Sequence, residues 1–299
     1  MDSLWTDWPC GVNSDFLIDS YRNIFHHPTG AQQKENTALY VYFDSVLVAA
    51  IDNDFSTNAY STRGGAPEMN GIRHVFFDLD NTIWDFEKSS MATLRELYDK
   101  YTLAELGVTS FEAFVTAYKN RNELLWEEYR MGKVDKATLR NKRFALTFWD
   151  MGLDPETAPP AMADDYVELG PRKSHLFPHA HETLDYLQQK YTLHIITNGF
   201  AEAQSVKMEA SDLNKYFNEV IISEHTGYKK PDVRIFQHSM EKAGAMENEC
   251  LMIGDGLEVD VIGAQQAGWR AIFFNPHGFL HEAQPDAEIK ELKELMGIL

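Results

Sequence analysis

The chain has few cysteines and no long apolar run. Cys10 and Cys250 are the only cysteines among 299 residues, which is too few for the disulfide framework of a small secreted protein. No apolar segment approaches the roughly 20 residues needed to cross a bilayer. The N-terminus has no basic segment followed by an apolar core, so we expect no secretory signal. These absences favour a cytoplasmic protein without a membrane partner.

Basic residues are also scarce, with 27 Lys and Arg against 46 Asp and Glu and a formal net charge of −19. Such a field repels long polyanions, which argues against a nucleic acid polymer as partner. A small phosphorylated metabolite is still compatible, because a metal ion and a few local cations can dominate at short range. Since 44% of the residues are hydrophobic, we expect a globular protein with one large or two modest domains.

The central segment of the sequence is a short apolar run that ends in two carboxylates. Val75–Phe77 has the aromatic and β-branched composition of a buried strand. Asp78 and Asp80 follow, and residues two apart in a strand point the same way. Two adjacent carboxylates are costly to bury. They suit a divalent cation, or a nucleophile beside a proton carrier. The pattern equally fits an acidic turn in which Asp80 caps a helix.

Helical and strand-like patterns then occur in separate blocks. Four amphipathic helices without a strand between them are expected over residues 88–103, 109–132, 135–151 and 160–169. Thr109 and Glu112 form a capping-box pattern at the second of these helices. Strands at 192–197, 219–223, 250–254 and 270–275 then alternate with helices at 181–190, 201–213, 233–243 and 257–267. This order predicts an α/β, Rossmann-like parallel sheet with helices on both faces, plus an inserted all-helical domain.

The domain division follows from these blocks. Residues 69–86 and 178–299 would form the sheet domain, and 87–177 the helical domain. Residues 1–68 have a different composition, with one plausible strand over 38–51 and a turn-rich stretch after it. We expect 1–68 to be an extension that is poorly ordered, or an artefact of the start site with Met69 as the true start, although a small accessory domain is the alternative.

Each later strand is followed by polar residues that could meet at one sheet edge. Thr197 and Asn198 follow the second strand, and could hold phosphate or simply form an Asn-Gly turn. Lys230 precedes a proline at a helix start, where its ammonium could reach a phosphate, whereas Lys229 is expected to be solvated. Asp255 and Asp260 follow the fourth strand and offer oxygen ligands that suit Mg²⁺, or a helix cap.

These signals, in this order, resemble the haloacid dehalogenase (HAD) superfamily of phosphohydrolases. The four signature motifs of that superfamily are similar to His74–Thr82, Leu193–Thr197, Lys230-Pro231 and Leu251–Asp260. The resemblance extends from about residue 69 to the C-terminus, and the helical domain resembles the C1 cap of the superfamily. It therefore implies a HAD core with a C1 helical cap.

The resemblance assigns roles to the acidic residues. Asp78 would be the nucleophile that forms an aspartyl-phosphate, and Asp80 the acid and base that protonates the leaving oxygen and then activates water. Mg²⁺ would be held by Asp78, by the backbone carbonyl of Asp80 and by Asp255, with support from Asp260. Splitting the transfer through an acyl-phosphate makes each half easier.

The resemblance likewise assigns the phosphate to Thr197, Asn198 and Lys230. An aspartate at position 80 favours a phosphatase over a haloalkanoate dehalogenase, because a leaving alkoxide needs a proton and a leaving halide does not. A sugar-phosphate mutase is a further alternative, because it uses the same aspartate pair.

Several further strings are similar to the pyrimidine 5′-nucleotidase branch that removes modified nucleotides. These strings are Asn81–Phe86, Leu125–Lys133, Asn141–Phe144 and His194–Phe200. They imply a nucleoside 5′-monophosphate phosphatase. We separately expect a monomer or homodimer. A sugar-phosphate or phosphoglycolate-type phosphatase is one alternative, and a non-catalytic phospho-ligand binding module is another.

Four residues in or near the cap are candidates for substrate specificity. Trp84, Phe86 and Trp126 could stack on a base, although aromatic residues at helical spacing are more often in the core. Arg130 could meet the phosphate or the base.

Overall fold

The computed structural model describes residues 42–43, 46–47 and 69–299. The predictions for 1–68, including the alternative start at Met69, otherwise fall outside the described residues. Within that stretch, β1(Tyr42–Phe43) and β2(Val46–Leu47) pair as antiparallel strands. The predicted continuous strand over 38–51 is therefore wrong, because the chain reverses between these two short strands.

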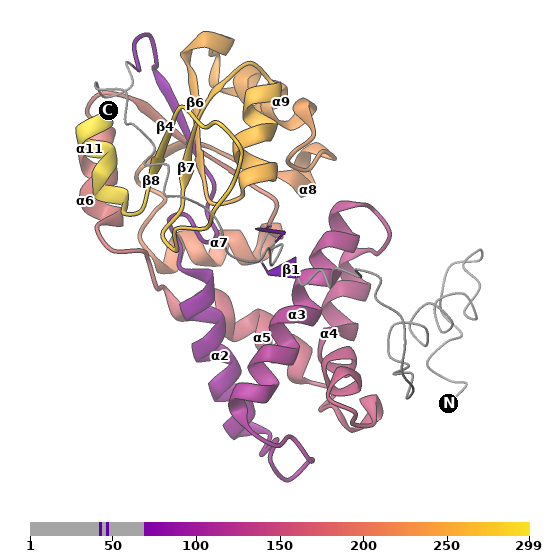
Figure 1. The fold of residues 1–299 in the computed structure, drawn as a ribbon. Helices are drawn as coiled ribbons and strands as arrows, with labels where there is room; N and C mark the ends of the chain where they lie inside the picture. The colour runs from indigo at the N-terminus through magenta and orange to yellow at the C-terminus, as the bar shows by residue number, and fades with distance from the viewer. Residues whose placement is uncertain (1–41, 44–45, 48–68) are drawn as a thin grey trace, which may run out of the picture. The chain divides into compact units, whose positions relative to one another are not determined.

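A six-stranded parallel sheet lies at the centre of the sheet domain (Figure 1). Its order is β5-β4-β3-β6-β7-β8, with neighbours paired in parallel. The strands are β3(His74–Phe77), β4(Thr192–Thr197), β5(Phe217–Ile222), β6(Cys250–Gly254), β7(Arg270–Phe274) and β8(Ala287–Ile289). The predicted α/β fold and its five strands are confirmed. The edge strand β8 was missed, since three residues carry no measurable periodicity.

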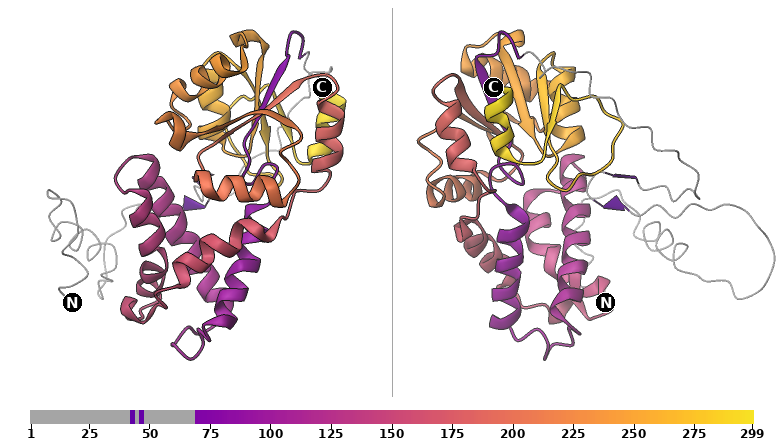
Figure 2. Two further views of the ribbon diagram at one scale, coloured as in Figure 1. Left: turned by 180° about the vertical axis from the view of Figure 1, so that it is seen from behind. Right: turned by 60° about the vertical axis from the view of Figure 1, so that its left-hand side comes forward.

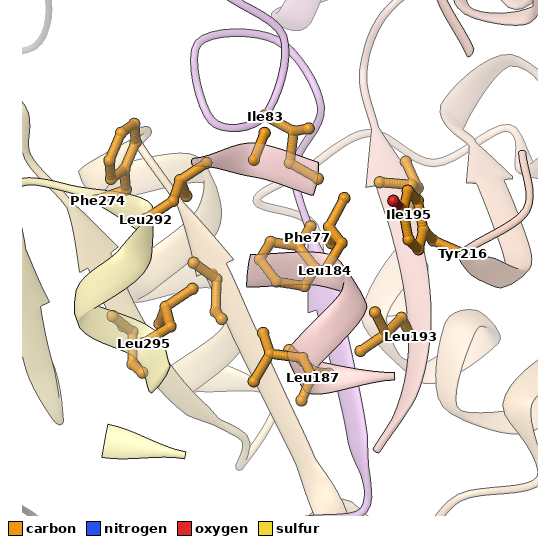
Figure 3. Close-up of a cluster of buried hydrophobic side chains, with 14 of the residues drawn as sticks. Phe77, Ile83, Leu184, Leu187, Leu193, Ile195, Tyr216, Phe274, Leu292 and Leu295 are labelled. Carbon is orange, nitrogen blue, oxygen red and sulfur yellow. The ribbon is translucent and has the colours of Figure 1, made fainter. Parts of the chain in front are cut away.

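Helices cover both faces of the sheet, as the two views in Figure 2 make clear. They are α6(Ala180–Leu187), α7(Ala201–Ala210), α8(Ser223–Thr226), α9(Val233–Ala243), α10(Gly263–Gln266) and α11(Leu295–Ile298). One face packs on α6 and α11, where Phe77, Leu184 and Leu295 belong to one buried cluster (Figure 3). The other face packs on α9 through Phe76 and Phe236. Alternate residues of β3 thus enter opposite cores, which is typical of a strand buried on both sides.

Four helices between β3 and β4 form the inserted helical part, as predicted. They are α2(Phe86–Lys100), α3(Phe111–Arg130), α4(Lys136–Asp150) and α5(Met162–Leu169). Short 3₁₀ turns lie at Pro155–Thr157, Gly170–Lys173, Glu247–Glu249 and Leu292–Glu294, and a π-helical turn lies at Leu257–Ile262. The N-cap of α3 is Ser110, whose hydroxyl accepts from the Ala113 N–H. The predicted cap at Thr109 is one residue too early. Within the described residues, no helix combines the length and apolarity required to cross a membrane.

A pair of histidines lies side by side in the sheet. His194 of β4 is fully buried, and its Nε2 lies 3.1 Å from Nδ1 of His74 on β3. Its ring stacks on Phe76 with 4.5 Å between centroids. Burial, followed by the neighbouring His74, lowers the pKa of His194 to about 4. His194 is therefore neutral in the folded protein at pH 7.

His194 should make folding sensitive to acid. Its pKa of about 4 in the folded state lies below the ordinary value of 6.5, so the unfolded chain binds more protons between these values. The contribution of His194 is complete above pH 6.5 and is lost as the pH falls toward 4, by about 3 kcal/mol. We expect His194→Gln to flatten the dependence of unfolding free energy on pH in this window. Denaturant titrations from pH 4 to 8 measure it. Equal slopes for His194→Gln and the wild type would contradict the assignment, and the exposed His225→Gln is the control.

Candidate active site

Asp78 stands at the carboxyl end of the central strand β3. Its backbone N–H donates to the carbonyl of Ile253 on β6 at 2.9 Å, so the sheet fixes the backbone position of Asp78. The residue is 8% exposed. Burial raises the pKa of Asp78 to about 7; Lys230 opposes this rise, and Asp260 and Asp80 add to it. Burying this carboxyl group is costly, and a buried carboxyl group with a strongly shifted pKa is typical of a functional site.

Lys230 links two of the predicted acidic residues. Its ammonium is 2.6 Å from Asp78 Oδ1 and 2.6 Å from Asp260 Oδ1. Burial acts to lower the pKa of Lys230, but the carboxylates of Asp260 and Asp78 outweigh burial and raise it. The lysine is thus a permanent cation between two carboxylates, at the distance of a charge-assisted hydrogen bond from each.

Three carboxylates meet at this sheet edge. Oxygen atoms of Asp78, Asp255 and Asp260 lie within 4.8 Å of one another. Burial, then the charges of Asp78 and Asp260, raise the pKa of Asp255, so the group is electrostatically crowded. Hard oxygen donors packed this closely fit Mg²⁺. Asp260, predicted as support, lies within the cluster itself.

Close backbone approach holds Asp260 in place. A Cβ on Gly254 or on Gly256 would lie 2.3 Å from the nearest atom, of Asp260 and Val259 respectively. The Gly256 N–H donates to Asp260 Oδ2 at 2.9 Å. The chain here forms a π-helical turn over Leu257–Ile262, rather than the α-helix predicted from residue 257. A π-turn is a common departure at functional sites.

Thr82 is a site residue that sequence reasoning missed. Its hydroxyl donates to Asp255 Oδ1 at 3.0 Å and accepts from the Asp255 N–H at 3.0 Å. Thr82 is fully buried. It therefore orients Asp255 toward Asp78. Its position four residues after Asp78 was the sequence signal that could have identified it.

The hydroxyl of Thr197 accepts two hydrogen bonds, so its hydrogen is available to donate a third. Its Oγ1 accepts from the Gly199 N–H at 3.0 Å and from Gln204 Nε2 at 2.7 Å. With both lone pairs used, the hydroxyl hydrogen is left to donate. Asn198 instead exchanges two 2.9 Å hydrogen bonds with the backbone of Lys230. Its side chain thus ties two loops of the site together, and its contact with phosphate stays a prediction.

Asp80 lies beside α7 and makes two contacts there. Its Oδ1 is 2.5 Å from Lys207 Nζ, and its Oδ2 accepts from Gln204 Nε2 at 2.7 Å. Sequence reasoning missed both partners. Their spacing of three residues within a helix predicted at 201–213 was a usable signal, because it puts two polar side chains on one face.

The four candidates for substrate specificity differ in how far their side chains are buried. Trp84 is 2% exposed and belongs to the sheet-domain core, with Lys207 Nζ 4.5 Å from its ring centroid. Burial therefore favours the core alternative for Trp84 over stacking on a base. Phe86 and Trp126 are partly exposed and Arg130 is exposed, so these three remain candidates.

Several contacts join the helical part to the sheet domain. Trp126 of α3 stacks on Phe200 with centroids 4.9 Å apart. Lys136 of α4 reaches Glu202 at 2.7 Å and Glu224 at 3.0 Å. The Lys229 ammonium donates to the carbonyl of Tyr129 at 2.9 Å. The prediction that Lys229 is solvated is therefore wrong, since it ties the loop of Lys230 to α3.

Comparisons with known proteins agree with this geometry. The family model for haloacid dehalogenase-like hydrolases matches residues 72–268. The chain is 32% identical, over 76% of its length and 94% of the relative, to the pyrimidine 5′-nucleotidase PynA of Streptococcus pneumoniae. It is similar to a magnesium-bound structure of the putative HAD-hydrolase YfnB from Bacillus subtilis, with a TM-score of 0.68, 28% identity and coverage of 76% and 98%. A 2-haloacid dehalogenase from Pseudomonas syringae gives a TM-score of 0.53 at 31% identity, with coverage of 76% and 97%.

Proposed function

The chain belongs to the haloacid dehalogenase-like hydrolases, and we propose that it hydrolyses nucleoside 5′-monophosphates through an aspartyl-phosphate on Asp78. The observation that carries this proposal is the contact of the Lys230 ammonium with Asp78, 2.6 Å away, at the sheet edge shared with Asp255 and Asp260. Phosphoryl transfer depends on alignment and charge neutralisation. A buried carboxylate held by a permanent cation supplies a nucleophile of this kind.

The residues of the site divide the reaction into two steps. In the first, an Asp78 oxygen attacks phosphorus, the bond to the leaving oxygen breaks, and Asp80 supplies the proton to that oxygen. In the second, Asp80 takes a proton from water, whose oxygen attacks phosphorus and releases Asp78. Thr197 and Lys230 bind the phosphoryl oxygens, with Thr197 donating from its remaining hydrogen. Mg²⁺ held by Asp78, Asp255 and the Asp80 carbonyl would add positive charge against the phosphoryl oxygens.

The presence of Asp80 supports a phosphatase rather than a dehalogenase. An alkoxide leaving group needs the proton that a second carboxyl can deliver, whereas a halide leaves without one. We therefore expect no halide release from 2-haloacids, although several structural neighbours carry the name of a 2-haloacid dehalogenase.

The proposal of a pyrimidine nucleotide as substrate rests on the relatives and on partly exposed aromatic rings. PynA is a pyrimidine 5′-nucleotidase by name. Phe86 and Trp126 are partly exposed at the helical part and can offer ring faces to a base. Phosphate release from UMP, dUMP, dTMP, AMP, phosphoglycolate and glyceraldehyde 3-phosphate tests this. We expect kcat/KM to be at least about tenfold higher for the pyrimidine nucleotides, since stacking and edge contacts are worth one to a few kcal/mol. A preference for the sugar or glycolate phosphates would replace the substrate class, and no release from any of them would refute the phosphatase.

Removal of divalent metal should silence the enzyme. We expect EDTA to abolish phosphate release and Mg²⁺ to restore it, because the ion held by Asp78 and Asp255 would supply positive charge against the phosphoryl oxygens. Mg²⁺ at 100 times its Kd should also stabilise the EDTA-treated protein by about 2.7 kcal/mol. Thermal melts with and without Mg²⁺ measure this independently of turnover, and Asp255→Asn should lose the shift. Full activity in EDTA would remove the metal from the proposal.

A further inference from the structure

Helix α7 presents two buried polar side chains to Asp80. Gln204 is fully buried, and the Lys207 side chain is 8% exposed. Lysine is almost never buried unless it is paired, and here its partner is Asp80 at 2.5 Å. The Lys207 ammonium also lies 4.5 Å from the Trp84 ring centroid and 5.8 Å from that of Phe86. The two aromatic rings and one carboxylate together hold the ammonium in a single place.

The amide of Gln204 connects two site residues. Its Nε2 donates at 2.7 Å to Asp80 Oδ2 and at 2.7 Å to Thr197 Oγ1, so both of its hydrogens are used. The amide can approach because residue 199 is glycine, where a Cβ would lie 1.8 Å from Nε2 of Gln204. One side chain thus fixes the distance between the proton carrier and the predicted phosphate ligand.

We propose that Lys207 and Gln204 are positioning residues that fix the carboxylate of Asp80, and through Gln204 the hydroxyl of Thr197. This inference rests on the proposed phosphatase function. Each Asp80 oxygen has its own donor from α7, so the carboxylate cannot rotate without breaking a buried contact. Acid and base catalysis depends on such placement to within a fraction of an ångström. Trp84, which is too buried to bind a base, contacts the Lys207 ammonium through its ring face.

The test compares two leaving groups. The leaving oxygen of UMP needs the Asp80 proton, whereas 2,4-dinitrophenolate leaves without one. The second step needs Asp80 as a base for both substrates. In Lys207→Met, which retains an apolar stem, we expect kcat for UMP to fall about 10- to 100-fold, with KM within about threefold of the wild type. With 2,4-dinitrophenyl phosphate the same variant should release one equivalent of dinitrophenolate in a burst and then turn over slowly.

Three further variants complete the experiment. Gln204→Met should also lower kcat for UMP and show the burst while leaving Lys207 charged, and it serves as the second probe if Lys207→Met unfolds. Its KM should rise in addition, because the Thr197 hydroxyl loses its contact with Gln204. Lys207→Arg should recover most of the turnover, because a guanidinium can still donate to Asp80. Lys215→Met removes the ammonium of an exposed lysine paired with Asp212, and should match the wild type.

The outcomes separate this inference from the proposed function. If kcat of both probe variants stays within twofold of the wild type, the inference is wrong. An equal loss in the burst phase and in UMP turnover would also overturn it, since that pattern indicates damage independent of proton transfer. If the wild type releases phosphate from neither UMP nor the aryl phosphate, the proposed function fails and the inference falls with it. The inference is supported if the burst appears only in Lys207→Met and Gln204→Met and if Lys207→Arg recovers most of the turnover.

Discussion

Asp78→Asn is expected to reduce phosphate release by at least about three orders of magnitude while the protein stays folded. An amide oxygen is a poor nucleophile, and it cannot carry the phosphoryl group as a labile acyl-phosphate. The fold should tolerate the change, since Asn has nearly the same shape and Lys230 keeps its ion pair with Asp260 at 2.6 Å. Circular dichroism melts and phosphate release from UMP measure the two expectations together.

A trapping experiment and a nearby carboxylate sharpen this test. Wild-type enzyme that is acid-quenched during turnover of labelled substrate should carry a hydroxylamine-sensitive label, and Asp78→Asn should carry none. Asp85 is the matched control, because it caps α2 by accepting from the Lys88 N–H at 2.8 Å and lies outside the acidic cluster. Asp85→Asn should retain activity, as asparagine caps helices nearly as well. Appreciable turnover by Asp78→Asn would exclude Asp78 as the nucleophile.

The strands and the residues at their ends could be predicted because local sequence specifies them. β4 and β6 have the predicted bounds, 192–197 and 250–254, since each is a short run of apolar residues bounded by polar ones. The carboxyl ends of parallel strands meet at one edge. Asp78 and Asp255 were therefore expected at the same edge, and the pairing of β3 with β6 makes them neighbours.

The partners of these residues could not be predicted in the same way. Gln204 and Thr82 act on side chains more than 100 positions away, and such pairings depend on how helices and loops settle on the sheet. The role of Trp84 also depends on tertiary contacts. The sequence left open whether Trp84 stacks on a base or lies in the core, and its packing against the core and Lys207 favours the second.

Lys230→Met is expected to destabilise the folded protein by about 3–5 kcal/mol and to abolish turnover. The variant leaves Asp78 and Asp260 buried at 8% and 1% exposure without their shared cation, and an uncompensated buried charge carries a cost of this size. Adding Asp260→Asn should recover part of the stability but none of the activity, because Asp78 still lacks its ammonium. Urea unfolding of the single and double variants measures the coupling, provided that the m-values agree. The adjacent Lys229→Met is the control, expected to cost about 1 kcal/mol because it loses one half-buried hydrogen bond to the Tyr129 carbonyl. If Lys230→Met were as stable as Lys229→Met, the cation would not be what holds these carboxylates together.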